Sequence, residues 1–368
     1  MKIDRFELRR VAMPLVTPFR TSFGTQTDRD VLIVRVEGSN GEGWGECVAM
    51  NEPLYSSEYV AGAHAVVRDH LVPRLLAHES ISAARVATVL AEVKGHPMAK
   101  AALEMAVLDA ELSARGMSFG EYFGATQERI PSGVSVGISP SLDHLIDTVG
   151  GYVAQGYVRI KLKIEPGWDL EPVRAVRERF GTDLLLQVDA NAAYQLADAR
   201  RLAELDAFDL LLIEQPLPED DIAGHALLAE RIRTPICLDE SILSAAIAAD
   251  AIHRGACAIV NIKAGRVGGY LEARRIHDVC RAQGVPVWCG GMLETGLGRA
   301  ANLALGALPG FTLPGDTSAS DRYWETDLTA PFQLEQGHIR VPTGPGLGVR
   351  PISEVLDRTT TSVETITR

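Results

Sequence analysis

The sequence predicts an α/β fold, a TIM-like (β/α)7β barrel that carries an N-terminal α+β capping domain. From about residue 130, short apolar segments alternate with helical stretches at a step close to 25 residues, the length of one βα unit. Seven or eight such units in a row favour a closed parallel barrel. The first 125 residues lack this rhythm, and a chain of 368 residues has room for a barrel plus a cap.

The capping domain is predicted over residues 1–125. Alternating apolar residues in FELRRVAM and VLIVRVEG predict an antiparallel pair around SFGTQTD, and GEGWGECVAM reads as a further short strand. The stretch from about Ser57 to Arg115 reads as helical and ends at Gly116. Its apolar stripe, which is Ala102, Met105, Ala106, Leu108 and Leu112, indicates core packing.

The barrel is predicted over residues 126–320, and the segment 321–368 is expected to pack back on the cap. The predicted strands of the barrel are GVSVGI, VRIKLKI, LLLQVDAN, LLLIEQP, PICLDES, AIVNIKAG and VPVWCGG, with FTLPGD as a candidate eighth. A doubly wound open sheet is the competing architecture. It would usually show a Gly-rich loop after its first strand, and GISPSL is not such a loop.

Composition narrows the class of partners. The formal net charge of −12, without any basic run, argues against a nucleic-acid partner. No stretch approaches 18 apolar residues, and MKIDRFELRR lacks the apolar core of a signal peptide, so we expect no membrane partner. Five cysteines without CxxC spacing suit reduced thiols in a cytoplasmic protein.

The segment VRIKLKI places two lysines on one face of a strand, Lys161 and Lys163. An edge strand with one wet face could have this pattern. In a barrel, however, helices cover the outside and side chains fill the inside, so both lysines would be buried near the catalytic end. A buried lysine requires a partner.

Charged residues recur at the same level of strands two to six. Steps of 24 to 26 residues connect Lys163, Asp189, Glu214, Asp239 and Lys263. Any one of them could be an ordinary salt-bridged strand end, but five in consecutive units indicate a site. The sequence at PICLDES offers both Asp239 and Glu240, and we expect the second to point away as a supporting residue.

This arc of lysine, three carboxylates and lysine predicts a metal site. Converging carboxylates repel one another unless a cation lies among them. Oxygen-only ligands select a hard divalent ion, above all Mg²⁺, and the absence of HExxH argues against zinc. The cation and a second ammonium would lower a lysine pKa, which would let one lysine act as a base. The pattern therefore predicts removal of a proton next to a metal-bound carboxylate, followed by inversion or by loss of a β-leaving group.

The motifs also resemble those of a known family. KLKIEPGWD, QVDANAAY, LLLIEQPL, ICLDES, VNIKAGRVGGYLEA and PVWCGGMLETGLGRAANLAL look like the enolase superfamily, in its muconate-lactonizing subgroup. Within that subgroup they resemble the N-acylamino acid (N-succinylamino acid) racemases that also act as o-succinylbenzoate synthases. The likeness extends over nearly the whole chain and includes PFRTSFGTQ, GEGWGECV and LPGDTSASDR. A lysine base with magnesium is already known for the superfamily.

The resemblance implies a role for each matching residue. Lys163 and Lys263 would be the paired acid/base groups, and Asp189, Glu214 and Asp239 the Mg²⁺ ligands, with Mn²⁺ or Co²⁺ as substitutes. The positions expected around the substrate are Ser135, Lys161, Asn191, Gly291, Met292 and Leu293. The cap residues Phe19, Phe23, Met50 and Tyr55 would form an apolar lid, although ordinary packing in the cap would also explain them.

The function expected is racemisation of N-acylamino acids, N-succinylamino acids first among them, by a homo-oligomer. The alternative in the same site is o-succinylbenzoate synthase, a dehydration in menaquinone biosynthesis that needs only one base. Two other classes stay open at this point. A metal-dependent hydrolase would need a second metal or histidine ligands, and a non-catalytic barrel would make the lysines incidental.

Overall fold

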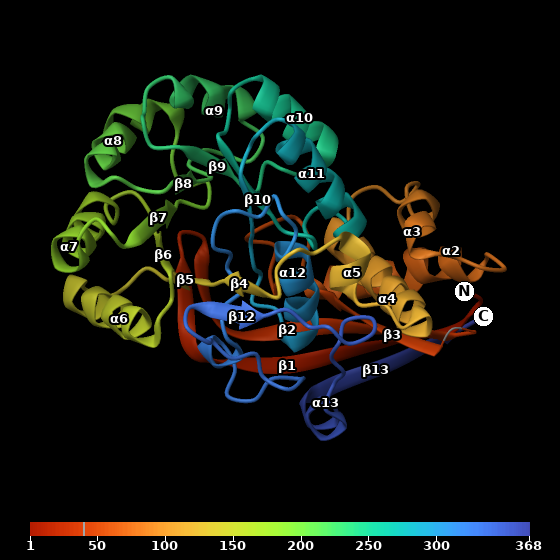
Figure 1. Cartoon of the computed structure of the whole chain (residues 1–368). Coiled ribbons are helices and arrows are strands. Elements are labelled where there is room, and N and C mark those ends of the chain that lie inside the picture. The colour runs from red at the N-terminus through yellow and green to blue at the C-terminus, as the bar shows by residue number, and fades with distance from the viewer. Residues whose placement is uncertain (40) are drawn as a thin grey trace.

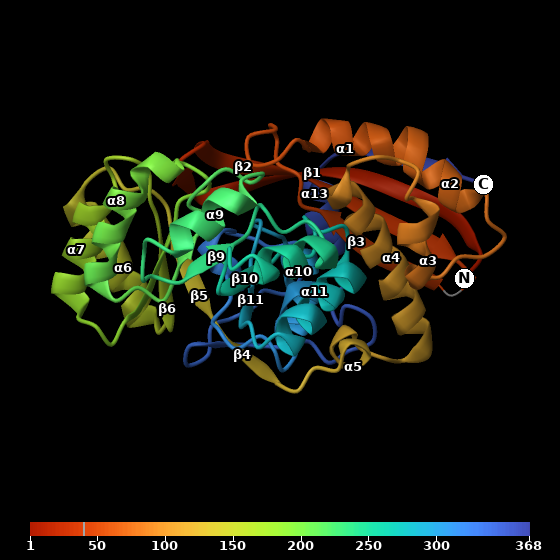
Figure 2. The same ribbon diagram turned by 90° about the horizontal axis from the view of Figure 1, so that it is seen from above.

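A computed structural model describes residues 1–39 and 41–368. Figure 1 shows an antiparallel sheet with helices beside a curled parallel sheet whose helices form an outer arc. In Figure 2 the cap helices lie at one end of the molecule and the barrel helices α6 to α9 at the other. The two chain ends lie close together, and the backbone N–H of Arg368 donates to the carbonyl of Asp4 at 3.3 Å.

The cap sheet contains four strands in the order β13-β1-β2-β3. Their bounds are Thr360–Thr367, Ile3–Thr21, Gly24–Gly38 and Gly41–Cys47. All three pairings are antiparallel, which confirms the predicted pair and the third strand. The alternation read from the sequence reappears as inward-facing residues along β1, among them Phe6, Leu8 and Val11, all of which are buried.

The stretch predicted to be helical contains several helices. It comprises α1 (Val60–Val66), a π-helical turn (Val67–Leu71), α2 (Val72–Leu76), α3 (Ala83–Val89) and α4 (Pro97–Arg115), followed by α5 (Phe119–Phe123). Helix α4 ends at Gly116, whose φ of 66° is left-handed, as the sequence predicts. All five residues of the predicted stripe are buried, which confirms that it packs in the core, and burial extends beyond the stripe, because 14 residues of α4 are buried and they occupy every face.

Seven parallel strands form the second sheet, in the order β11-β10-β9-β8-β7-β6-β5. Their bounds, from β5 to β11, are Gly133–Val136, Arg159–Lys163, Leu185–Asp189, Ile213–Glu214, Ile236–Leu238, Ile259–Ile262 and Val287–Cys289. The crossover helices are α6 (Leu142–Gln155), α7 (Leu170–Phe180), α8 (Ala199–Ala203), α9 (Ile222–Ala229), α10 (Ala245–His253), α11 (Tyr270–Ala282) and α12 (Gly296–Gly306). Short 3-10 turns flank α8, at Leu196–Asp198 and Glu204–Phe208. Every residue of β6 is buried, so the wet-edge interpretation of VRIKLKI is wrong.

The candidate eighth strand makes only single bridges. Phe311 pairs with Val287 on β11, and Gly315 pairs with Ser132 just before β5. The segment therefore contacts both open edges of the curled sheet without a continuous ladder. Pro314 lies within it and has no N–H to donate, which is a physical reason for the missing ladder.

The remaining elements include a third sheet, of two strands. Strand β4 (Arg129–Pro131) pairs with β12 (His338–Arg340), and a 3-10 turn (Ser320–Arg322) and α13 (Ser353–Thr359) complete the elements. Among the described residues no helix is long and apolar enough to cross a membrane. All five cysteines are free and buried.

Candidate active site

A cavity of about 550 Å³, measured out to its open mouth, lies at the carboxyl ends of the parallel strands under the cap. This volume falls in the ordinary range for small-molecule sites. The cavity brings together both predicted acid/base lysines and all ten predicted substrate contacts. These are Lys163, Lys263, Ser135, Lys161, Asn191, Gly291, Met292, Leu293, Phe19, Phe23, Met50 and Tyr55.

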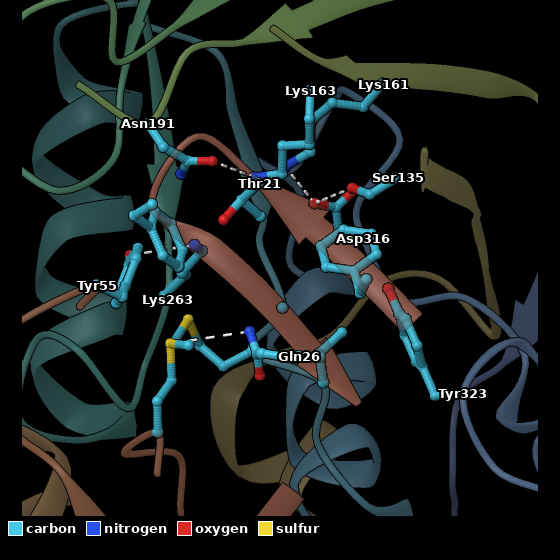
Figure 3. Close-up of a pocket in the computed structure, with 16 residues that line it drawn as sticks. Thr21, Gln26, Tyr55, Ser135, Lys161, Lys163, Asn191, Lys263, Asp316 and Tyr323 are labelled. Atoms are coloured by element: carbon cyan, nitrogen blue, oxygen red, sulfur yellow. Dashed lines mark hydrogen bonds and ion pairs between the residues drawn. The ribbon is translucent and has the colours of Figure 1, made fainter. Parts of the chain in front are cut away.

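Lys163 is the last residue of β6 and enters the cavity beside Asn191 (Figure 3). Its Nζ donates to Oδ2 of Asp189 at 2.6 Å and to Oδ1 of Asn191 at 2.7 Å. Asn191 in turn donates to Glu240 at 2.9 Å. Glu240 thus contacts the site through Asn191.

Lys263 follows β10 and lies with Tyr55 in another part of the cavity wall (Figure 3). Its Nζ donates to Asp239 at 2.8 Å and to the hydroxyl of Tyr55 at 3.1 Å. Arg266 contacts the other oxygen of Asp239 at 2.9 Å. The two lysines are therefore held by different carboxylates.

The protein groups by themselves do not lower the pKa of Lys263. Burial alone would lower it, but attraction to Asp239, Tyr55, Glu240 and Glu214 raises the pKa of Lys263 well above its ordinary value. This direction is opposite to the expected one. The expected lowering therefore depends on the positive charge of a bound cation, which would offset the carboxylates.

Lys161 lies deeper on β6 and is 1% exposed. Its Nζ contacts Asp316 at 2.5 Å, Glu214 at 3.0 Å and Asp189 at 3.2 Å. Asp316 also accepts from Arg159 at 2.8 Å. Burial alone would raise the pKa of Asp316, but Lys161 and Arg159 hold it well below its usual range.

The three predicted metal ligands lie beneath the cavity and are completely buried. Asp189 and Glu214 are register partners on neighbouring strands, and Asp239 directly follows β9. Each accepts a contact from a lysine, and within residues 1–39 and 41–368 no three His, Cys, Asp or Glu side chains stand at metal-binding geometry. The three carboxylates thus lie at the same level of their strands, as predicted, but their side chains do not surround a common point. A metal ion would have to displace the lysines that contact them.

The donor set nevertheless fits a hard divalent cation. Burial and then repulsion by Asp189 and Asp239 raise the pKa of Glu214, despite the attraction of Lys161. A cation placed among these oxygens would favour the charged carboxylate. Carboxylate oxygens are also the ligands that Mg²⁺ prefers.

The cap supplies an apolar wall over this site. Phe23 packs on Tyr55 with ring centroids 6.1 Å apart, and Phe19 meets Tyr323 edge-on at 6.4 Å. The tip of the β1–β2 hairpin is fastened to the barrel loops. Arg20 pairs with Glu165 at 2.8 Å, which holds Phe19 and Phe23 at the mouth.

Sequence reasoning missed several residues of the cavity. They are Thr21, Gln26, Asp316 and Tyr323. Asp316 had a signal, because it is the charged last residue of the candidate eighth unit, FTLPGD. Arg266 lies outside the cavity and contacts Asp239, and its only signal was its place three residues after Lys263. Thr21, Gln26 and Tyr323 come from outside the barrel repeats and had none.

The fold and site together define an enzyme in which an N-terminal α+β unit lies over a curled parallel sheet, with lysines and carboxylates at the strand ends. Two protein-family models match the sequence. The family described as Mandelate racemase / muconate lactonizing enzyme, N-terminal domain, matches residues 5–124, and the family described as Enolase C-terminal domain-like matches residues 144–355. The chain belongs to the enolase superfamily, as the motifs predict. Members of this superfamily generally use Mg²⁺.

Individual relatives span nearly the whole chain. It is 68% identical over 362 residues to the N-succinylamino acid racemase of an Amycolatopsis species, with 98% of each chain covered. It is 48% identical over 350 residues to the o-succinylbenzoate synthase of Geobacillus kaustophilus, covering 95% of this chain and 93% of that one. A crystal structure of an enolase superfamily member from Listeria innocua, 40% identical, matches with a TM-score of 0.95 over 100% of this chain and 99% of that one.

Proposed function

We propose that this protein racemises N-acylamino acids, with N-succinylamino acids as preferred substrates, by proton transfer between two lysines. The observation that supports it best is that Lys163 and Lys263 line one cavity from different strands and are held by different carboxylates. The relative at 68% identity carries the racemase name. Inversion of a carbon centre requires a base on one face and an acid on the other, which two separately held lysines supply.

Each residue has a defined task in this proposal. Asp189, Glu214 and Asp239 would hold Mg²⁺, with Mn²⁺ or Co²⁺ as substitutes, and the cation supplies positive charge that favours loss of a proton next to a carboxylate. Lys163 Nζ takes the α-proton on one face and Lys263 Nζ returns a proton on the other. For the opposite enantiomer the roles exchange. The remaining cavity residues orient the substrate, and the cap wall excludes water.

A second activity, o-succinylbenzoate synthesis, is proposed for the same cavity. Its support is the synthase name carried by relatives such as the Geobacillus kaustophilus protein. Dehydration needs one base and a leaving group, and the opposite ammonium would then stabilise the developing negative charge. Assaying both reactions on the purified protein separates the main activity from the side activity.

Several finer features belong to this proposal. The division into a cap (1–125), a barrel (126–320) and a returning segment (321–368) is supported by the two sheets and by the pairing of β13 with β1. Closure of the barrel by residues 311–316 is supported by their bridges to both edges. Free, buried cysteines support a reducing, cytoplasmic compartment. Assembly as a homo-oligomer stays a prediction.

The decisive experiment is α-proton exchange in D₂O. With Mg²⁺, one enantiomer of an N-succinylamino acid should lose its α-proton signal while the other enantiomer appears. Lys163→Ala and Lys263→Ala should each abolish inversion, and each should still exchange the α-proton of the one enantiomer that faces its remaining lysine. Chiral chromatography and proton NMR measure the two outcomes.

The control is Lys94→Ala, because Lys94 is an exposed lysine in the cap. Parental racemisation in either active-site variant would make the two-base assignment wrong. No exchange with any N-acylamino acid, by the parental protein with Mg²⁺, would remove the racemase proposal itself.

A further inference from the structure

We propose that Asp316 is a positioning residue that draws the ammonium of Lys161 toward itself and so weakens the hold of that ammonium on Asp189 and Glu214, which lets a divalent cation compete for those carboxylates. The inference rests on the proposed function, because it takes Asp189 and Glu214 as metal ligands. The side chain of Asp316 contacts Ser135, Arg159 and Lys161, and no described hydrogen bond or ion pair joins it to Lys163 or Lys263.

Lys161 is shared among three carboxylates, two of which, Asp189 and Glu214, are completely buried. Its Nζ lies 2.5 Å from Asp316 Oδ2, 3.0 Å from Glu214 Oε2 and 3.2 Å from Asp189 Oδ2. An ammonium among the ligands competes with a metal for the same oxygens and also repels it, strongly so in a buried site. The affinity for metal therefore depends on how far the ammonium is held toward Asp316.

Trp288 and Ser135 complete the surroundings of Lys161 and Asp316. The ring of Trp288 lies 4.9 Å from Lys161 Nζ and 5.2 Å from the guanidinium carbon of Arg159. The hydroxyl of Ser135 donates to Asp316 Oδ2 at 3.2 Å. Figure 3 shows Ser135 and Asp316 on one side of the lysine pair and Asn191 on the other.

Asp316 itself is fixed in place by the backbone. Its N–H donates to the carbonyl of Cys289 on β11 at 2.9 Å, and the preceding carbonyl, of Gly315, accepts from Gly133 on β5 at 2.8 Å. Arg159 anchors its side chain from below at 2.8 Å. The lysine is the flexible partner of this pair, so Asp316 determines where the ammonium lies.

Direct Mn²⁺ binding, followed by the EPR signal of the free ion and without substrate, tests the proposal. Asp316→Asn should bind Mn²⁺ about 10- to 100-fold more weakly, the range seen when a group behind metal ligands is lost. Asp316→Glu keeps the charge and should recover most of the affinity. A parental affinity in a folded Asp316→Asn would overturn the proposal.

A double-mutant cycle distinguishes positioning from general damage. If Asp316 acts by holding Lys161, then Lys161→Gln added to Asp316→Asn should restore Mn²⁺ affinity to within about twofold of Lys161→Gln alone. A merely structural role would leave the double variant as weak as Asp316→Asn. If Asp316→Asn fails to fold, the single variant Lys161→Gln decides. On this proposal, removing the competing ammonium cannot weaken metal binding. A loss of Mn²⁺ affinity of about tenfold or more in Lys161→Gln would therefore overturn the proposal.

Asp169→Asn is the matched control. Asp169 is a buried aspartate paired with Arg201 at 2.6 Å, and its loss should lower thermal stability while leaving Mn²⁺ affinity unchanged. The experiment distinguishes failure of the proposed function from failure of the role proposed for Asp316. If the parental protein binds no metal, the proposed function fails, whereas parental binding that Asp316→Asn shares refutes only the role of Asp316.

Discussion

At the scale of single residues, Tyr55 shows how the cap completes a group of the barrel. Its hydroxyl accepts from Lys263 Nζ and donates to Asp239, both at 3.1 Å, and the lysine lies 4.6 Å from its ring. Tyr55→Phe keeps the apolar wall but removes both hydrogen bonds. We expect turnover to fall about tenfold in both directions, as for other groups that orient catalytic ligands, with little change in KM. Initial rates from each enantiomer measure this.

Tyr194→Phe controls for the loss of a buried hydroxyl, since that hydroxyl donates to Asp169 at 2.9 Å outside the cavity. It should keep parental turnover. Equal losses of turnover in the two variants would mean that Tyr55 acts only through stability.

The charged strand ends could be predicted from the sequence because the barrel repeats at a fixed interval. Periodicity gives the level of a residue on its strand, and so it located Lys163, Asp189, Glu214 and Lys263. It does not give pairings between repeats and the cap. The contact of Tyr55 with Lys263 spans 208 residues, and nothing in either local sequence indicates it.

At the scale of elements, glycines in β3 allow helix α4 to lie directly on the strand. A Cβ on Gly45 would overlap the carbonyl oxygen of Ala102, and one on Gly43 would overlap that of Ala106. Gly45→Ala should therefore lower the free energy of unfolding by about 1–3 kcal/mol, the usual cost of overpacking. Denaturant unfolding followed by circular dichroism measures the change.

Gly151→Ala is the opposite case in helix α6. Gly151 is exposed, and a Cβ there would meet nothing within 4 Å. Alanine in this helix interior should raise the free energy of unfolding by about 0.5–1 kcal/mol. A stabilising Gly45→Ala would show that α4 can move off the strand.

Element types were easier to predict than element ends. The βα rhythm fixed the seven barrel strands, because each is an apolar run between helical segments. The stretch from Ser57 to Arg115 was predicted as helical without internal boundaries, since its apolar residues recur at helical spacing, and it contains several short helices followed by the long helix α4. The burial of α4 on every face depends on Gly43 and Gly45, which lie in a different element.

At the scale of the whole molecule, buried glutamates of the cap bind the amino ends of barrel helices. Glu46 on β3 accepts from the backbone N–H groups of Thr295 and Gly298 at the start of α12, at 3.0 and 2.9 Å. Glu104 on α4 accepts from Leu271 in the first turn of α11 at 3.0 Å. The cap and the barrel are thus joined by carboxylates that helix amino ends favour.

The charge state of these glutamates makes stability depend on pH. Burial raises the pKa of Glu104 from 4.5 to about 7, although hydrogen bonds from Leu271 and Tyr270 act in the other direction. Between these two pH values the unfolded chain has lost the proton and the folded chain keeps it. Stability contributed by this group therefore falls as pH rises from about 4.5 to 7 and is constant above that. Glu46 has the same raised pKa of about 7.

Glu104→Gln isolates one such group from the histidines, which also titrate in this range. The variant should match the parental protein near pH 5, where Glu104 is protonated in the folded state. Its stability relative to the parental protein should then increase with pH, by up to roughly 3 kcal/mol at pH 8, because each pKa unit corresponds to about 1.4 kcal/mol. Denaturant unfolding at several pH values measures the difference. A difference that is constant from pH 5 to pH 8 would mean that Glu104 is already ionised in the folded protein, held in that form by the amino end of α11.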